Sequence, residues 1–258
     1  MKNSGHKLFV GVDEYDAPVN AVLARRTNTL YQDLTAFFTS SFFGVLKSAV
    51  SQDIVVKYWL TGVLPAFRNG ISPLSATRIL SKTPQFHGLC GFTDAEVRTI
   101  AESYLPSTSK SYDIEAVMHE LQQWHNGYRF CQAPMGEVIE PLYNPQLVCA
   151  HLESLVKGHS TRPDDELEAL HTTNVLNSID KSTFREIFLL AASAKLDSTT
   201  VKHQFSAEEF RGAEENSWLT HTLLFFFGIF TFAESGKFLK IPNKTVQTLV
   251  CFNIASPF

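Results

Sequence analysis

Apolar runs and an amphipathic stretch alternate over the first quarter of the chain. Residues 8–12 carry no charge and run directly into Asp13 and Glu14, and residues 54–60 form a second run that is apolar apart from one lysine. Near-continuous apolar runs are typical of strands buried on both faces of a parallel sheet. Between them, over residues 30–49, apolar residues recur at steps of three and four, the period of a helix that covers a sheet. The pattern predicts a strand, a helix and a second parallel strand.

The remainder of the chain reads as mainly helical. Thr93 and Glu96 have the spacing of a capping box, which predicts a helix that ends near Tyr104. Asp113 is expected to cap a helix through Trp124, and Asn144 is followed by a proline suited to a first helical position. The apolar stripe of the helix after Asp113 consists of Ile114, Val117, Met118, Leu121 and Trp124. Later helices are predicted near 182–194, 206–210 and 217–227, strands at 229–233 and 238–241, and a last helix from 243.

Composition narrows the class of protein. An apolar content of 44% and a charged content of 19% in 258 residues are ordinary for a globular protein, and a net charge of −4 gives no electrostatic footprint for nucleic acid. The four cysteines show no C-x-x-C spacing, so we expect buried reduced thiols. The first residues lack the apolar segment of a secretory signal, and the longest apolar stretch, 218–232, is too short to span a bilayer. We therefore expect an intracellular protein, cytoplasmic or nuclear, with no membrane contact.

The acids that follow the first predicted strand are the strongest candidates for chemistry. Open α/β sheets bind ligands at the carboxyl ends of their strands, where Asp13 and Glu14 are expected to lie. In P-loop NTPases this arrangement is the Walker B element, in which the first acid helps to hold Mg²⁺ and a following glutamate orients the attacking water. The alternative is a strand that ends in an acidic turn. Asp16 is either a third acid of the site or a turn-stabilising residue before Ala17 and Pro18.

Six segments together carry a family resemblance. They are Leu8 to Pro18, Trp59 to Val63, Leu89 to Val97, Trp124 to Phe130, Tyr143 to Pro145 and Leu239 to Asn243. In order and spacing, the sequence resembles the AAA-ATPase-like family, a divergent P-loop group often found ahead of a PD-(D/E)XK nuclease-like domain. The resemblance implies an α/β partial P-loop NTPase sheet over residues 1–66, a mainly helical lid over 67–160, and a winged-helix-like C-terminal module over 161–258.

The resemblance also implies roles for individual residues. Asp13 would hold Mg²⁺, Glu14 would act on the attacking water, and both would contribute to the ATP site. Thr61, at the end of the second strand, would sense the γ-phosphate, with a plain β-branched strand residue as the alternative. Arg68 would supply positive charge to the transferring phosphoryl group, although surface solvation is the more common role of an arginine. The C-terminal module would bind a protein partner or nucleic acid.

One P-loop element is missing from the sequence. No G-x-x-x-x-G-K-[ST] run, whose backbone N–H groups and lysine cradle the phosphates, occurs in the 258 residues. We expect this loop to lie upstream of Met1, which makes the chain an N-terminally truncated ATPase module that is inactive and binds no cofactor alone. Two alternatives stay open: a non-catalytic interaction module, and the ATPase half of a nuclease-linked effector.

Overall fold

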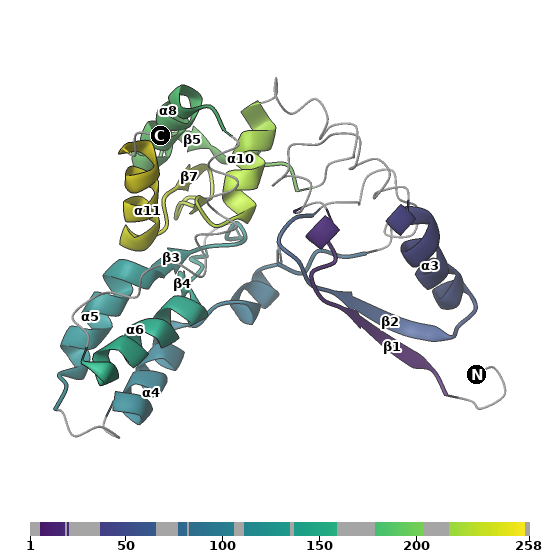
Figure 1. The fold of residues 1–258 in the computed structure, drawn as a ribbon, viewed down its shortest axis with the longest axis horizontal. Coiled ribbons are helices and arrows are strands. Elements are labelled where there is room, and N and C mark those ends of the chain that lie inside the picture. Colours follow the sequence, from purple (N-terminus) through teal and green to yellow (C-terminus); the bar gives the residue numbers. More distant parts are fainter. Residues whose placement is uncertain are drawn as a thin grey trace. The chain divides into compact units, whose positions relative to one another are not determined.

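The chain forms two compact units in a computed structural model, which describes residues 6–18, 20, 37–65, 77–81, 83–105, 111–134, 137–158, 179–203 and 217–255. The first unit combines Met1–Arg78 with Thr200–Phe227, and the second combines Ile79–Thr199 with Gly228–Phe258. This division differs from the three predicted consecutive segments, because each unit combines an early stretch of the chain with a late one. Thr200–Phe227 belongs to the first unit, and Gly228–Phe258 belongs to the second. Figure 1 shows the helices and strands of both units.

The first unit contains a pair of parallel strands. Strand β1 (Leu8–Val12) lies beside β2 (Val55–Leu60), with Val10 opposite Tyr58 and Val12 opposite Leu60 (Figure 1). Helix α3 (Gly44–Ser51) contacts β2 and continues from a π-helical turn, η1 (Phe38–Phe43). The described part of the predicted helix at 30–49 is thus helical. Helix α10 (Ser217–Phe226) also belongs to this unit.

The core of the second unit is a cluster of three helices. Helices α4 (Asp94–Tyr104), α5 (Ile114–His125) and α6 (Pro145–Lys157) contact one another. The buried apolar residues of this core are Val97, Ala101, Leu105, Val117, Met118, Leu121, Tyr143, Val148 and Leu152. The predicted stripe on α5 needs one correction: His125, and not Trp124, is buried at its C-terminal end. A buried hydrogen bond between His125 and His151 of α6 accounts for this choice.

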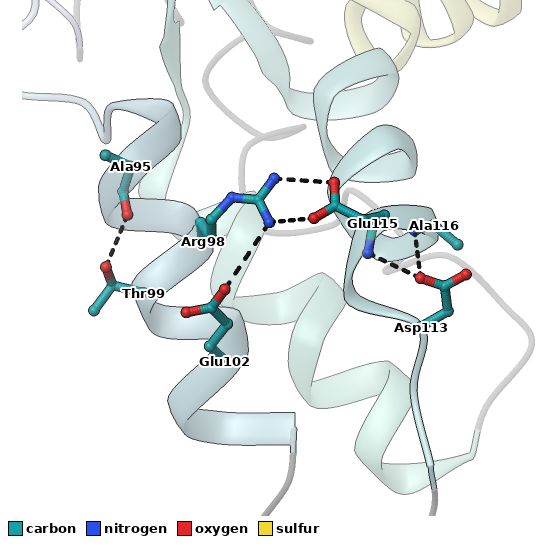
Figure 2. A network of polar contacts seen from close by, with 7 residues as sticks. All are labelled: Ala95, Arg98, Thr99, Glu102, Asp113, Glu115 and Ala116. Carbon is teal, nitrogen blue, oxygen red and sulfur yellow. Dashed lines mark hydrogen bonds and ion pairs between the residues drawn. The ribbon is translucent and has the colours of Figure 1, made fainter.

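The predicted helix starts of this cluster are confirmed by their caps. Thr93 and Glu96 form both hydrogen bonds of a capping box, and the Asp113 carboxylate accepts from the backbone of Glu115 and Ala116. Figure 2 shows how this cap leads into a surface network, in which Arg98 of α4 reaches Glu115 through two hydrogen bonds of 2.6 and 3.1 Å. These exposed ion pairs fix the register of the two helices and contribute little stability.

Two small sheets complete the second unit. Strand β3 (Asn126–Tyr128) pairs with β4 (Leu142–Tyr143); β3 directly follows α5, and β4 lies just before α6. Strands β5 (Leu196–Asp197), β6 (Thr231–Phe232) and β7 (Phe238–Lys240) form an antiparallel sheet in the order β5-β7-β6. Helix α8 (Lys181–Ala192) contacts β5 and β7, and α11 (Lys244–Ala255) contacts α5. A 3₁₀ turn, η3 (Pro84–Leu89), precedes α4.

The three short strands β3, β4 and β5 were not predicted, because strands of two or three residues leave no periodic pattern. The helix predicted at 206–210 lies outside the described residues. The expectation of buried thiols is wrong for three of the four cysteines: Cys90, Cys149 and Cys251 are exposed, and only Cys131 is buried. Within the described part of the chain, no helix has both the length and the apolar character needed to cross a membrane.

Candidate functional site

The C-terminal ends of β1 and β2 bring Asp13 and Thr61 into direct contact. The backbone pairing of the strands extends past their ends, because Thr61 N donates to Val12 O at 2.9 Å and Tyr15 N donates to Thr61 O at 3.0 Å. The Thr61 hydroxyl donates to Asp13 Oδ1 at 2.5 Å. Two residues that are 48 positions apart in the sequence therefore share one edge of the sheet.

Glu14 adopts a backbone conformation that is uncommon for its residue type. Its φ angle is +48°, and its N–H donates to Asp13 Oδ1 at 3.0 Å. Positive φ in a residue other than glycine is disfavoured, and such positions concentrate at functional sites. The left-handed turn leaves the Glu14 side chain exposed beside Asp13. Both carboxylates are thus accessible to a ligand at this end of the sheet.

Asp16 holds the loop after β2 against the turn after β1. Its side chain is 1% exposed, and Oδ2 accepts from Leu64 N at 2.6 Å, Val63 N at 3.1 Å and Asn20 Nδ2 at 3.1 Å. Burial raises the pKa of Asp16 above its ordinary value, and the hydrogen bonds from Leu64, Asn20 and Val63 oppose that effect. Of the two roles considered for Asp16, the geometry supports the structural one.

Gly62 is required for the close approach of these two segments. A Cβ atom at this position would lie 2.2 Å from Asp16 Oδ1 and 2.8 Å from Tyr15 Cδ1, where no atom fits. The Tyr15 hydroxyl closes the contact by donating to Leu64 O at 2.6 Å. Gly62 thereby allows the loop that carries Thr61 to sit directly on the acidic turn.

We expect Asp16→Ala to loosen this contact. The substitution leaves the buried N–H of Leu64 and the partly buried N–H of Val63 without their acceptor, which is expected to lower the free energy of unfolding by about 3 kcal/mol. Hydrogen exchange of these two amides is the specific measurement, and both should lose protection. Unchanged slow exchange would contradict the assigned role.

Asp53→Asn serves as the control for this substitution. Asp53 forms an ion pair with Lys7 at 2.5 Å, but its side chain is 72% exposed. Its φ angle of +56° is one that asparagine tolerates as well as aspartate does. Loss of this exposed pair is therefore expected to leave both the unfolding free energy and the two amides nearly unchanged.

The side chains at this edge suit a hard divalent cation. Asp13, Glu14 and Thr61 offer oxygen atoms only, which are the ligands that Mg²⁺ prefers. Among the residues that the structure describes, no group of three or more acidic, histidine or cysteine side chains forms a complete metal cage. Mg²⁺ is usually bound through one or two carboxylates together with substrate phosphates and water, so a complete cage is not needed.

Three of the four predicted site residues are thus described, and all three lie together at one edge. Arg68, the fourth, lies outside the described residues. The sequence missed Tyr15 and Asn20, which fix the turn through Leu64 and Asp16. Asn20 follows Asp16 by four positions, a spacing at which two side chains meet on one helical turn. This spacing could have predicted the hydrogen bond between Asn20 and Asp16 from the sequence.

Comparison with known proteins bears on this part of the chain. Residues 1–72 match the family model described as a predicted AAA-ATPase, of AAA-ATPase-like type. The match contains both strands, Asp13, Glu14 and Thr61, and it confirms the resemblance for residues 1–72, which hold two of the six segments that carry it. No curated protein and no solved structure gives a significant match.

Proposed function

We propose that this chain, in which residues 1–72 belong to the AAA-ATPase-like family, supplies the metal-binding and water-activating side of an ATP hydrolysis site. The observation that carries the proposal is the contact between Asp13 and Thr61 at the ends of adjacent parallel strands. This placement supports a P-loop type of sheet, in which an acid and a polar residue on neighbouring strands face the terminal phosphate.

Each residue has a distinct task in this proposal. Asp13 would hold Mg²⁺ through its carboxylate, and Thr61 would contact the γ-phosphate or the water. Glu14 accepts a proton from the water that attacks the γ-phosphorus. When bound, Mg²⁺ neutralises charge on the phosphate oxygens. Glu14 directly follows Asp13 in the sequence, and the left-handed backbone conformation at Glu14 sets the direction in which its side chain leaves the chain.

The phosphate side of such a site requires a G-x-x-x-x-G-K-[ST] loop, which the 258 residues do not contain. Two carboxylates without that loop repel an anionic nucleotide, so we expect the chain alone to bind Mg-ATP weakly or not at all. Hydrolysis is accordingly tested in a polypeptide that carries this chain together with such a loop.

In that polypeptide, Glu14→Gln is expected to preserve Mg-ATP binding and to lower turnover by at least roughly a hundredfold, the typical loss on removal of a general base. Asp13→Ala is expected to weaken metal-dependent binding itself, because it removes a charged ligand of Mg²⁺. Steady-state turnover and calorimetric binding separate the two effects. Turnover of Glu14→Gln at the parent rate would exclude Glu14 as the base.

A second candidate function is partner binding through the C-terminal part of the chain. Helix α8, strand β5 and the β6–β7 hairpin all lie in the second unit, and the sheet order is β5-β7-β6. This order supports a winged-helix-like arrangement, a type of module that binds proteins or nucleic acids. The net charge of −4 favours a protein partner over nucleic acid.

A further inference from the structure

Arg129 is a buried cation whose hydrogen-bonding capacity is largely unused. The residue is 6% exposed, and Nε donates to Ile139 O at 3.1 Å. Nη1 is buried and has no hydrogen-bond partner among the described residues. A guanidinium carries five N–H donors, and burying it without full pairing is costly. Arg129 can therefore donate further hydrogen bonds to an acceptor that reaches Nη1.

The main chain around Arg129 is firmly held. Arg129 N donates to Thr231 Oγ1 at 2.6 Å, and the same hydroxyl donates back to Arg129 O at 2.9 Å. Phe232 N also approaches Arg129 O, at 3.4 Å. These contacts tie Arg129 to strand β6, so the guanidinium is presented from a rigid backbone. Rigid presentation reduces the entropy that a ligand-binding side chain would otherwise lose.

Lys240 places a second cation on the strand beside Arg129, because it lies opposite Thr231, whose hydroxyl is hydrogen-bonded to the main chain of Arg129. Lys240 ends strand β7 and is partly buried. Burial lowers the pKa of Lys240, and the positive charge of Arg129 lowers it further, whereas Glu234 raises it. Arg129 also acts on His87, whose pKa is lowered first by burial and then by this guanidinium. The charge of Arg129 thus lowers the pKa of two residues on other segments, Lys240 and His87.

Glu234 forms an ion pair with Arg129, and it is a loose partner. Its Oε1 lies 3.7 Å from Arg129 Nη2, beyond hydrogen-bond distance, and its side chain is 77% exposed. The turn that carries it is fixed, because Gly236 N donates to Ala233 O at 2.9 Å and Ala233 N donates to Phe238 O at 2.8 Å. The backbone of the turn is therefore held in place, while the exposed side chain can rotate into solvent and leave Arg129.

We propose that Arg129 and Lys240 form a binding site for a phosphate group, and that Glu234 is the carboxylate which a phosphate displaces. A phosphate carries between one and two negative charges at neutral pH and several acceptor oxygens, which match two cations and a fork of N–H donors. A single tethered carboxylate supplies one charge and leaves Nη1 unpaired. This site lies in the second unit and is separate from the nucleotide site proposed for Asp13 and Glu14.

Calorimetric titration of the full chain with inorganic phosphate tests the proposal, with chloride at equal ionic strength as the reference. We expect saturable binding with a dissociation constant on the order of 1 mM. Glu234→Gln removes the competing charge and is expected to tighten binding about tenfold. Lys240→Met is expected to weaken it about tenfold, and Arg129→Lys, which loses the planar fork, by at least as much.

Lys237→Met is the matched control. Lys237 lies in the same hairpin and carries the same charge as Lys240, but its side chain is exposed. It lines a surface hollow together with Gln132, Asp197 and Ser198, and Arg129 is not among the lining residues of that hollow. We expect phosphate to bind this variant as it binds the parent. Equal losses in Lys237→Met and Lys240→Met would overturn the proposal, since they would indicate diffuse attraction. Absence of saturable binding in both the parent and Glu234→Gln would overturn it as well, without bearing on the nucleotide site.

Discussion

Replacement of Gly127 by alanine is expected to lower the free energy of unfolding by about 4 kcal/mol. Gly127 has a φ angle of +128°, which residues with a side chain rarely adopt, and a Cβ atom here would lie 2.0 Å from Pro242 O. The clash is with backbone, so no side chain can rotate away to relieve it. Two effects therefore add: the strained dihedral of alanine and the displacement of the segment that leads into α11.

Gly88→Ala is the appropriate control, because a Cβ atom at Gly88 would meet nothing within 4 Å. We expect this variant to unfold within about 0.5 kcal/mol of the parent. Guanidinium unfolding followed by circular dichroism measures both variants. If Gly127→Ala were as stable as Gly88→Ala, the close approach of Pro242 to Gly127 would be wrong.

The chain is expected to lose stability in mild acid because of a buried histidine pair. His125 and His151 are 3% and 4% exposed, and His125 Nε2 lies 2.9 Å from His151 Nδ1. Thr245 Oγ1 lies 3.3 Å from His125 Nδ1, and Glu120 Oε1 lies 4.0 Å from His151 Nε2. Neutral rings satisfy all of these contacts when Thr245 donates to His125 and His125 donates to His151.

Protonation is unfavourable in this arrangement. Burial, and then the charge of His151, lower the pKa of His125 from 6.5 to about 3. The unfolded chain takes up this proton near pH 6.5 and the folded chain only near pH 3, so acid favours unfolding. The contribution is fully present above pH 6.5 and is lost as the pH falls, by at most about 1.4 kcal/mol for each pH unit. Between pH 6.5 and 5 we therefore expect a loss of about 2 kcal/mol from this group.

Urea unfolding between pH 5 and 7 measures this dependence. His125→Gln, which can replace both hydrogen bonds, should remove about one proton from the slope. His119→Gln, at an exposed position of the same helix, should keep the slope of the parent. Ring NMR signals of His125 in the parent provide a second readout that does not depend on the folding of a variant. A His125 ring that titrates near pH 6 would refute the expectation.

Local patterns in the sequence were enough for most of the helices. Thr93 with Glu96, Asp113, and Asn144 with Pro145 mark helix starts that the structure contains. These signals act over three or four residues, because a cap satisfies backbone N–H groups of the first turn only. The apolar runs also marked the positions of β1 and β2, but the burial on both faces that they predicted is wrong: most residues of both strands are exposed or only partly buried in the structure.

The sequence by itself also determined the chemistry that the first unit can offer: Asp13 and Glu14 follow one apolar strand, and Thr61 follows another. Only the tertiary structure decided which of these groups meet. The hydrogen bond from Thr61 to Asp13, the burial of Asp16 under Val63 and Leu64, and the pairing of His125 with His151 join positions that are far apart in the chain. The physical reason is that burial and hydrogen bonding depend on distance in space. Periodicity and capping, by contrast, record only distance along the chain.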